Sequence, residues 1–291
     1  MKTKTAAVSL HDTKCLPADS IHLQDCLVGM QLIPDQSIDM ILCDLPYEVL
    51  HRNNPSVQWD RMLPLDQLWA QYLRIAKPNA AIVLFAQGMF TARLMMSQPD
   101  LWKYNLIWEK DRCTGFLNAN RMPMRNHEDI CVFYRQQPTY HPQMTVADSP
   151  IHPRGNGHHK ETYRCYGKHG ERPDEQVKKV GKTYDYAHIN RVAPTADPNL
   201  RFPCSVLQYK KEHDRTQSHP TQKPVDLLRY LIRTYTNPGD LVLDNCLGSG
   251  STCVAAIREG RHYLGFETDP EYFRIAQRRI AQEGERIIFP A

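Results

Sequence analysis

What the sequence lacks excludes several classes of protein at once. No apolar run reaches the roughly 20 residues that a membrane-spanning helix needs, so we expect no membrane association. The first 20 residues contain the early lysines Lys2 and Lys4, but no apolar stretch follows them, which argues against a secretory signal. At 291 residues with 41% hydrophobic residues, the chain can still build one large domain, or a core domain with an insert.

The cysteines form no CxxC pair, and their number, nine, is odd. Cys43 and Cys131 lie inside apolar runs, where a thiol behaves as a small hydrophobe. Four residues with metal-binding side chains lie close together, but their spacing matches no familiar zinc site: His158, His159, Cys165 and His169. We therefore expect reduced, buried thiols in a cytoplasmic protein, with no disulfide framework and no metal.

The net charge of +4 is concentrated in one segment. Residues 136–218 contain 13 Lys and Arg against 9 Asp and Glu, together with 7 of the 13 histidines, whereas the rest of the chain is balanced. The segment also lacks clear periodicity and is rich in Pro, Gly, His and Tyr. A basic, irregular insert is typical of contact with a polyanion. The charge alone is equally compatible with a solvated surface loop, which is the alternative.

Strand and helix patterns alternate on both sides of this insert. Before it, apolar runs predict strands at 21–23, 37–43, 80–86, 106–108 and 130–134, with helices at 27–32, 65–75 and 89–97. After it, the pattern predicts strands at 241–243 and 263–266, with helices at 225–235, 252–259 and 271–282. Such alternation predicts a doubly wound α/β fold with a mostly parallel sheet. Ligand sites in such sheets lie beyond the carboxyl ends of the strands.

The second half contains a glycine turn between a strand and a helix. Asp244 ends the strand and Gly248-Ser249-Gly250 follows, so that backbone N–H groups can surround a ligand. Glu267 ends the next strand, 19 residues after Gly248, where a carboxylate can accept hydrogen bonds from ribose hydroxyls. The turn is neither GxGxxG nor a phosphate-binding loop, which favours a nucleoside without a pyrophosphate, such as S-adenosylmethionine. The glycines alone fit a tight packing turn, and Glu267 is what favours a ligand.

The first half contains Asp44-Leu45-Pro46-Tyr47 directly after an apolar strand. The exocyclic amine of a nucleobase is a poor nucleophile, and two acceptors that bind its N–H bonds can draw its nitrogen toward tetrahedral geometry. The Asp44 carboxylate and the Leu45 carbonyl can supply these acceptors. Pro46 fixes the backbone turn, and Tyr47 offers a ring for stacking an extruded base. The alternative is an aspartate that caps a turn, with Tyr47 in the core.

In this order, the two motifs resemble those of the amino-group DNA methyltransferases, specifically the permuted β group, in which the catalytic motif precedes the cofactor motif. Three further segments are similar to motifs of that family: residues 126–130, 218–224 and 265–267. The resemblance covers residues 21–280. The Asp-Leu-Pro-Tyr and Asp-Asn-Cys motifs are also similar to those of phage-borne adenine methylases. The chain departs from the family at Leu45, where proline is usual, and at Asn245-Cys246, where Pro-Phe is commoner.

The resemblance implies a role for each part of the chain. Residues 1–20 would form a tail, 21–135 the catalytic half, 136–218 the target recognition region and 219–291 the cofactor-binding half. The implied catalytic pocket consists of Asp44, Leu45, Pro46 and Tyr47. The implied ligands of S-adenosylmethionine are Asp25, Thr221, Lys223, Asp244, Gly248, Ser249, Gly250 and Glu267. The expected contacts to double-stranded DNA are Arg112, Arg121, Arg125, Arg154, Lys160 and Arg164.

The implied function is a site-specific DNA adenine-N6 methyltransferase that transfers the methyl group directly to a flipped base. Aspartate at the first motif position favours adenine, whereas serine there is typical of cytosine-N4 enzymes, so cytosine N4 is the nearest alternative. An RNA or protein-amine methyltransferase and an inactive nucleic-acid-binding module are further alternatives. A homodimer is a hypothesis, and both a restriction–modification pair and a solitary enzyme stay open. We expect the protein in the cytoplasm, on the nucleoid when it binds DNA.

Overall fold

The computed structural model describes residues 15–47, 61–146, 200–210 and 222–288. The chain divides into two units, Met1–His141 with Ser205–Ala291, and Pro142–Cys204. In the second unit, the described residues include a two-stranded antiparallel sheet of β6 (Thr145–Val146) and β7 (Leu200–Arg201). The fold that positions the candidate site lies in the first unit.

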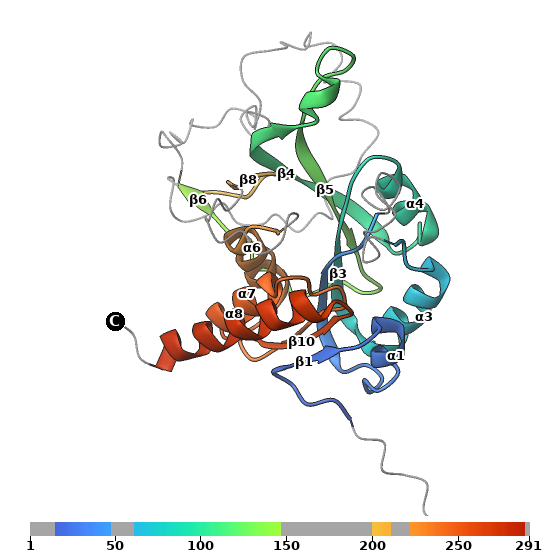
Figure 1. The fold of residues 1–291 in the computed structure, drawn as a ribbon, viewed down its shortest axis with the longest axis vertical. Coiled ribbons are helices and arrows are strands. Elements are labelled where there is room, and N and C mark those ends of the chain that lie inside the picture. Colours follow the sequence, from blue (N-terminus) through green and yellow to red (C-terminus); the bar gives the residue numbers. More distant parts are fainter. Residues whose placement is uncertain (1–14, 48–60, 147–199, 211–221, 289–291) are drawn as a thin grey trace, which may run out of the picture. The chain divides into compact units, whose positions relative to one another are not determined.

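The first unit is built on an eight-stranded sheet with the order β1-β10-β9-β2-β3-β5-β4-β8 (Figure 1). Its strands are β1 (Ser20–Leu23), β2 (Ile38–Asp44), β3 (Ala76–Ala86), β4 (Trp102–Thr114), β5 (Arg125–Phe133), β8 (Val206–Gln208), β9 (Leu241–Asp244) and β10 (His262–Glu267). Neighbouring strands are parallel, except that β5 runs antiparallel to both β3 and β4. The predicted α/β fold with a mostly parallel sheet is therefore confirmed.

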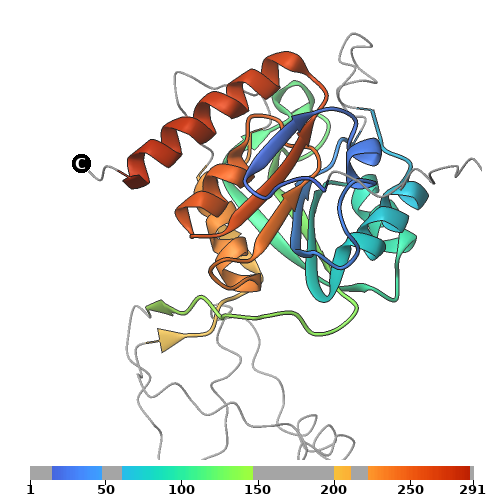
Figure 2. The same cartoon turned by 90° about the horizontal axis from the view of Figure 1, so that it is seen from below.

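Helices cover both faces of the sheet (Figure 2). One face carries α1 (Cys26–Met30), α3 (Leu65–Ile75) and α4 (Met89–Ser97), and the other carries α6 (Val225–Tyr235), α7 (Ser251–Arg258) and α8 (Pro270–Ile288). The bounds of α3, α4 and α6 equal the predicted ones, and α3 and α6 each bury a pronounced apolar face. None of the helices in the described ranges combines the length and apolar character needed to cross a bilayer.

Strands β4 and β5 are longer than the sequence predicts. Together with the short 3-10 turn η2 (Phe116–Asn118) they form a hairpin, in which Glu109 pairs with His127 and Thr114 with Arg125. The residues beyond Trp108 are polar and give no apolar pattern, so only the ladder of hydrogen bonds to the partner strand makes them a strand. Strand β3 likewise begins at Ala76, four residues early, and its pairing with β2 slips between Ala76 and Ala81.

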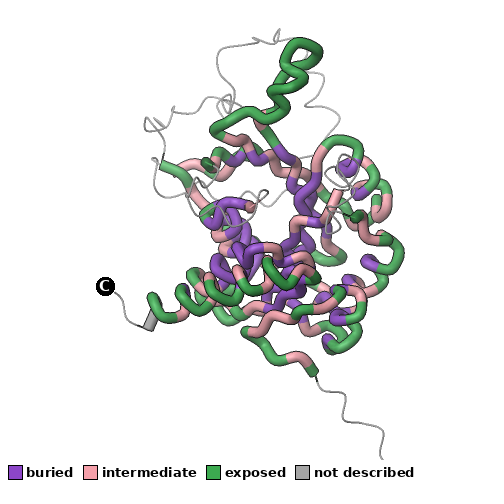
Figure 3. The backbone as a smooth tube through the Cα atoms, in the orientation of Figure 1, coloured by how far each residue is buried: buried purple, intermediate pink, exposed green. Residues whose placement is uncertain are grey.

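The core consists of two layers, one on each face of the sheet. In β3, Ile82 and Leu84 pack into the layer beneath α3 and α4, while Val83 and Phe85 pack into the layer beneath α6 and α7. Each of these four side chains is at most 3% exposed, and burial on both faces is what a central parallel strand requires. Figure 3 shows this buried centre, surrounded by exposed loops and helix faces.

The prediction of buried thiols holds for half of the described cysteines, and Cys15, Cys113 and Cys204 are exposed. Eight cysteines in the described ranges are free, and four of these are buried: Cys26, Cys43, Cys131 and Cys253. Cys165 lies outside the described residues. Burial raises the pKa of Cys43 and of Cys131 to about 12, so both thiols stay protonated at neutral pH.

The path of the chain produces a switch point between β2 and β9. These two strands are parallel neighbours, with Met40 opposite Val242 and Ile41 opposite Leu243. From β9 the chain continues to β10 on one side, and from β2 it continues to β3 on the other side. The connections therefore leave in opposite directions and open a crevice at the carboxyl ends of these strands, where ligands bind in such folds.

Gly29 allows α1 to pack against the end of β10. A Cβ atom at this position would lie 2.2 Å from Cε1 and 2.6 Å from Cδ1 of Phe266, which is 0% exposed. We predict that Gly29→Ala lowers the free energy of unfolding by about 1–3 kcal/mol, because the overpacked ring has no room to move. Urea unfolding followed by circular dichroism measures this change.

The matched control is Gly284→Ala in α8, where a Cβ atom meets nothing within 4 Å. There the substitution should stabilise the helix by up to about 1 kcal/mol, because alanine has the higher helix propensity. Equal unfolding free energies for Gly29→Ala and the unsubstituted protein would contradict the packing of α1 described above.

Candidate active site

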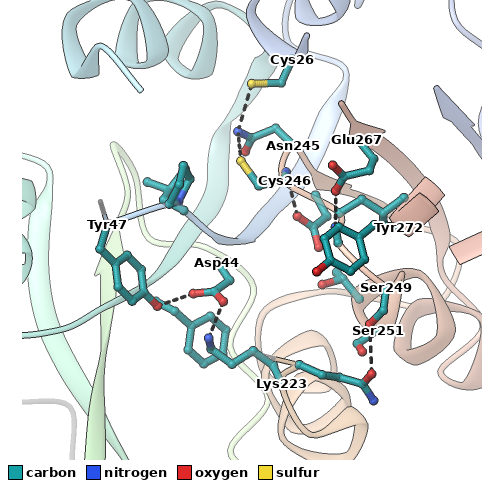
Figure 4. A pocket seen from close by; sticks show the side chains of 18 of the residues that line it. Cys26, Asp44, Tyr47, Lys223, Asn245, Cys246, Ser249, Ser251, Glu267 and Tyr272 are labelled. Carbon is teal, nitrogen blue, oxygen red and sulfur yellow. Dashed lines mark hydrogen bonds and ion pairs between the residues drawn. The ribbon is translucent and has the colours of Figure 1, made fainter. Parts of the chain in front are cut away.

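A pocket of about 730 Å³ lies at the switch point. Side chains from both halves of the chain line it (Figure 4). Of the residues predicted from the sequence, it is lined by Asp25, Asp44, Leu45, Pro46, Tyr47, Lys223, Asp244, Gly248, Ser249 and Glu267. The fold thus brings together the two motifs, which lie about 200 residues apart in the sequence.

Asp44 is the last residue of β2, and its carboxylate accepts hydrogen bonds from two side chains. Its Oδ1 accepts a hydrogen bond from the Tyr47 hydroxyl, and its Oδ2 accepts one from Nζ of Lys223 (Figure 4). The ring of Tyr47 is stacked on Phe90, with centroids 5.2 Å apart and planes tilted by 27°. Leu45 points into the core and is only 3% exposed. Asp44 keeps a side-chain exposure of 25%, so its carboxylate can be reached from the pocket.

Two lysines and two carboxylates form a compact, charge-balanced cluster beneath the pocket. Lys223 contacts both Asp44 and Glu128, with Nζ of Lys223 3.4 Å from Oε2 of Glu128. Lys110 pairs with the other oxygen of Glu128. Lys223 and Glu128 are 7% and 9% exposed, so each relies on its partners to stay charged.

The pKa values in this cluster follow from that balance. Burial opposes the charge of Lys223, but the carboxylates of Asp44 and Glu128 outweigh it and raise the pKa of the lysine. Burial also opposes ionisation of Glu128, yet Lys223 and Lys110 lower its pKa overall. For Asp44, burial raises the pKa, and the Lys223 ammonium opposes the shift. Burial thus favours the protonated form of Asp44, whereas the two lysines favour the ionised form of Glu128.

The glycine turn is fixed to the end of β10 by Glu267. Its Oε2 accepts the N–H of Gly248 at 2.7 Å, and its Oε1 accepts the N–H groups of Thr268 and Asp269, both at 2.8 Å. Burial raises the pKa of Glu267, and these hydrogen bonds oppose the shift. Gly250 has a φ of +80°, and a Cβ atom there would lie 3.0 Å from that of Ala276 in α8. Glycine is therefore required for the backbone at this position.

The polar residue in the unusual Asn245-Cys246 pair is buried but well partnered. Asn245 is 2% exposed, and its Oδ1 accepts a hydrogen bond of 2.5 Å from the Tyr72 hydroxyl. Its amide group donates to Sγ of Cys26 at 3.7 Å and of Cys246 at 3.5 Å (Figure 4). These bonds offset the cost of burying an amide. Cys26 and Cys246 also line the pocket, on the side of the glycine turn.

Two of the predicted cofactor ligands differ from the expectation. Gly250 is not among the described residues that line the pocket and instead packs against Ala276 of α8. Asp25 does line the pocket, but its carboxylate also caps α1, accepting the N–H groups of Leu27 at 2.8 Å and Val28 at 3.2 Å. The exposed arginines of the β4–β5 hairpin stand apart from the pocket lining: Arg112, Arg121 and Arg125. Several predicted residues lie outside the described residues: Thr221, Arg154, Lys160, Arg164 and the four zinc candidates. Within the described ranges, no cluster of His, Cys, Asp and Glu is suited to a metal.

The sequence assigned no role to several charged or polar residues of the pocket, among them Arg61, Lys110, Glu128 and Gln222, although the last two lie in segments that resemble family motifs. The sequence pattern could have identified Glu128, because the two-residue period of a strand places it on the same face as Ile130 and Val132. A carboxylate in such an apolar row points to a buried partner. No sequence pattern identifies Lys110, since its position depends on how β4 pairs with β5.

The buried environment of Asp244 can be tested without a ligand, through the pH dependence of the unfolding free energy. Burial raises the pKa of this carboxyl to about 6, against hydrogen bonds from the Thr252 hydroxyl and the Cys246 N–H. An unfolded aspartate ionises near pH 3.8, so the folded state holds its proton more tightly. We predict that the unfolding free energy loses up to about 3 kcal/mol through Asp244 as pH rises from about 4 to about 6.

Asp244→Asn should remove this loss. The unfolding free energy of the unsubstituted protein minus that of the variant then falls as pH rises through this window and is constant above it. Urea unfolding of both proteins at several pH values measures the difference. A difference that rises with pH would mean that Asp244 is stabilised as the anion.

Comparisons with known proteins show the family to which the chain belongs. A family model described as DNA methylase, of the N6/N4 type, matches residues 38–278. The chain is 25% identical to the DNA adenine methyltransferase YhdJ of Escherichia coli (strain K12) over 262 residues, which cover 88% of this chain and 80% of that protein.

Two solved structures share the fold. The PvuII DNA methyltransferase, described as cytosine-N4-specific, has a TM-score of 0.60 at 17% identity and covers 94% of both chains. The M1.HpyAVI–SAM complex has a TM-score of 0.56 at 19% identity, covering 89% of this chain and 98% of that one. Identity this low supports the fold alone. Because the family model covers most of the chain, the protein belongs to the N6/N4 DNA methylase family.

Proposed function

We propose that the protein is a DNA adenine-N6 methyltransferase that uses S-adenosylmethionine and acts at a specific site in double-stranded DNA. The observation that carries this proposal is the meeting of Asp44–Tyr47 with the glycine turn and Glu267 in one pocket. An acceptor for an amine and a binding site for a nucleoside then face the same space. Alignment of the two is the main requirement of a direct transfer.

The residues around the glycine turn fit the proposed cofactor. Gly248 lets the backbone approach a ligand closely, and Ser251 and Thr252 line the pocket at the N-terminus of α7. A carboxylate has about four lone-pair sites, and Glu267 uses three of them on backbone N–H groups. It therefore keeps capacity for one ribose hydroxyl without rearrangement. S-adenosylmethionine supplies a methyl group that is already activated on a sulfonium.

The residues around Asp44 fit the target amine. Each oxygen of Asp44 accepts one hydrogen bond and retains a second lone pair for an N–H of the base. The Leu45 carbonyl would take the other N–H bond, and Pro46 fixes the turn that presents it. Phe90 holds the plane of the Tyr47 ring, which lines the pocket and would stack on the base. Asp44 would then accept the proton that the methylated amine releases.

Adenine is the proposed target because an aspartate stands at position 44, and because YhdJ, a relative along most of the chain, is named a DNA adenine methyltransferase. Cytosine N4 is the second candidate, since the fold is shared with an enzyme named cytosine-N4-specific. Residues 136–218 are proposed as the target recognition region, and Arg154, Lys160 and Arg164 among its DNA contacts. A cytoplasmic location and a homodimer are parts of the same proposal, and sedimentation with and without DNA tests the dimer.

The test is transfer of labelled methyl groups from S-adenosylmethionine to unmethylated genomic DNA, followed by nucleoside mass spectrometry. We predict N6-methyladenine, and a rate at least about a hundredfold lower for Asp44→Ala, because the variant lacks the acceptor for the amine. N4-methylcytosine instead would preserve the mechanism and change the base. If no DNA is methylated, the proposal fails, and RNA or a binding role without turnover takes its place.

Glu267→Gln should affect binding rather than chemistry. We predict that the Kd for S-adenosylmethionine rises about tenfold to a hundredfold, because hydrogen bonds to a charged acceptor are lost at the turn. Calorimetric titration measures it. Asp44→Ala is the matched control and should keep the Kd of the unsubstituted protein. If both variants bind equally well, Glu267 is not a cofactor ligand.

A further inference from the structure

The tip of the β4–β5 hairpin, residues 111–125, is exposed at every position (Figure 3). It nevertheless carries four large apolar side chains. Phe116 and Leu117 are 80% and 95% exposed, and Met122 and Met124 are 56% and 43% exposed. Single exposed apolar residues are common on proteins, but a cluster of this kind marks a surface that contacts another molecule.

The backbone of the tip holds these side chains outward. Gly115 has a φ of +91°, which begins the 3-10 turn η2. Within the turn, the N–H of Asn118 donates to the Gly115 carbonyl at 2.9 Å, and the N–H of Arg121 donates to the Asn118 carbonyl at 2.8 Å. The two most exposed side chains, Phe116 and Leu117, therefore stand on a hydrogen-bonded turn at the end of a hairpin (Figure 1).

The tip begins at the mouth of the active-site pocket. Strand β4 is antiparallel to β5, as is β3, so β4 ends at the same edge of the sheet as β2 and β3. Lys110, which precedes the tip, and Thr114 and Gly115 within it line the same pocket as Asp44. Phe116 and Leu117 directly follow the pocket-lining Gly115, so the tip adjoins the pocket that would take the base.

The charge of the tip fits a nucleic acid. Arg112, Arg121 and Arg125 are exposed on it, against one acidic residue, Asp111. Arginines of this kind can bind the phosphates on either side of an apolar contact. Proteins that distort the double helix combine these two features, a basic surface and apolar side chains that insert between base steps.

We propose that Phe116 and Leu117 enter the base stack of double-stranded DNA and fill the gap left by the extruded target nucleotide. Arg112 and Arg121 bind the phosphates beside that gap. The inference rests on the proposed function, because a base must leave the duplex to reach Asp44. Extrusion costs unstacking energy, and the inserted side chains offset part of that cost, so they are positioning residues.

The test uses two synthetic duplexes that carry the site methylated by the unsubstituted protein in genomic DNA. In one duplex the target base is paired normally, and in the other it faces an abasic position. For Phe116→Ala/Leu117→Ala we expect the methylation rate on the paired duplex to fall about tenfold, the effect of a lost stacking contact. On the abasic duplex, where extrusion costs less, the rate should approach that of the unsubstituted protein.

Met96→Ala is the matched control, because Met96 is 74% exposed on α4 and does not line the pocket. It should leave both rates unchanged. A second double variant replaces Phe116→Ala by Phe116→Trp and so keeps an aromatic ring at this position. It should recover most of the methylation rate on the paired duplex. The Kd for S-adenosylmethionine should stay constant throughout the series.

The inference is overturned if the double variant methylates the paired duplex as fast as the unsubstituted protein, or if it loses the same factor on both duplexes. It is also overturned if sedimentation shows that the double variant converts a dimer to a monomer, which would make the tip a contact between copies. Failure of the proposed function looks different, because then the unsubstituted protein itself methylates neither duplex.

Discussion

The parallel pairing of β2 with β9 is the interaction on which the rest of the site depends. It joins residues about 200 positions apart through only two register pairs, Met40 with Val242 and Ile41 with Leu243. Asp39 strengthens the pairing, since its carboxylate accepts the N–H of Leu241 at 3.0 Å and an ion pair of 2.6 Å from Lys77. Because both strands end at the same edge, this pairing alone decides that the two motifs share a pocket.

The buried charges follow from the same arrangement. Lys223 precedes α6 in the second half of the chain, yet its ammonium contacts Asp44 and Glu128 in the first half. Isolated charges would be costly in so buried a place, but two lysines and two carboxylates compensate one another. The cluster therefore forms only when both halves are folded together, and it holds Asp44 in place before any substrate arrives.

The order of the motifs in the chain matters little to the geometry of the site. β1 pairs in parallel with β10, from Ser20 opposite Leu264 to Leu23 opposite Glu267, so the first and last strands are hydrogen-bonded neighbours. When the first and last strands are neighbours, the same open sheet can form whichever strand comes first in the chain.

The sequence by itself determined the elements with strong local periodicity and the residues at their ends, including Asp44, Glu267 and the glycine turn, because a strand end in a parallel sheet is a site by position. Only the tertiary structure decided the partners of Lys223 and of Glu128 and the length of the β4–β5 hairpin. Those features depend on pairings between distant segments, which a local pattern of polar residues does not record. The exposed apolar tip belongs with them, since its meaning comes from lying beside the pocket.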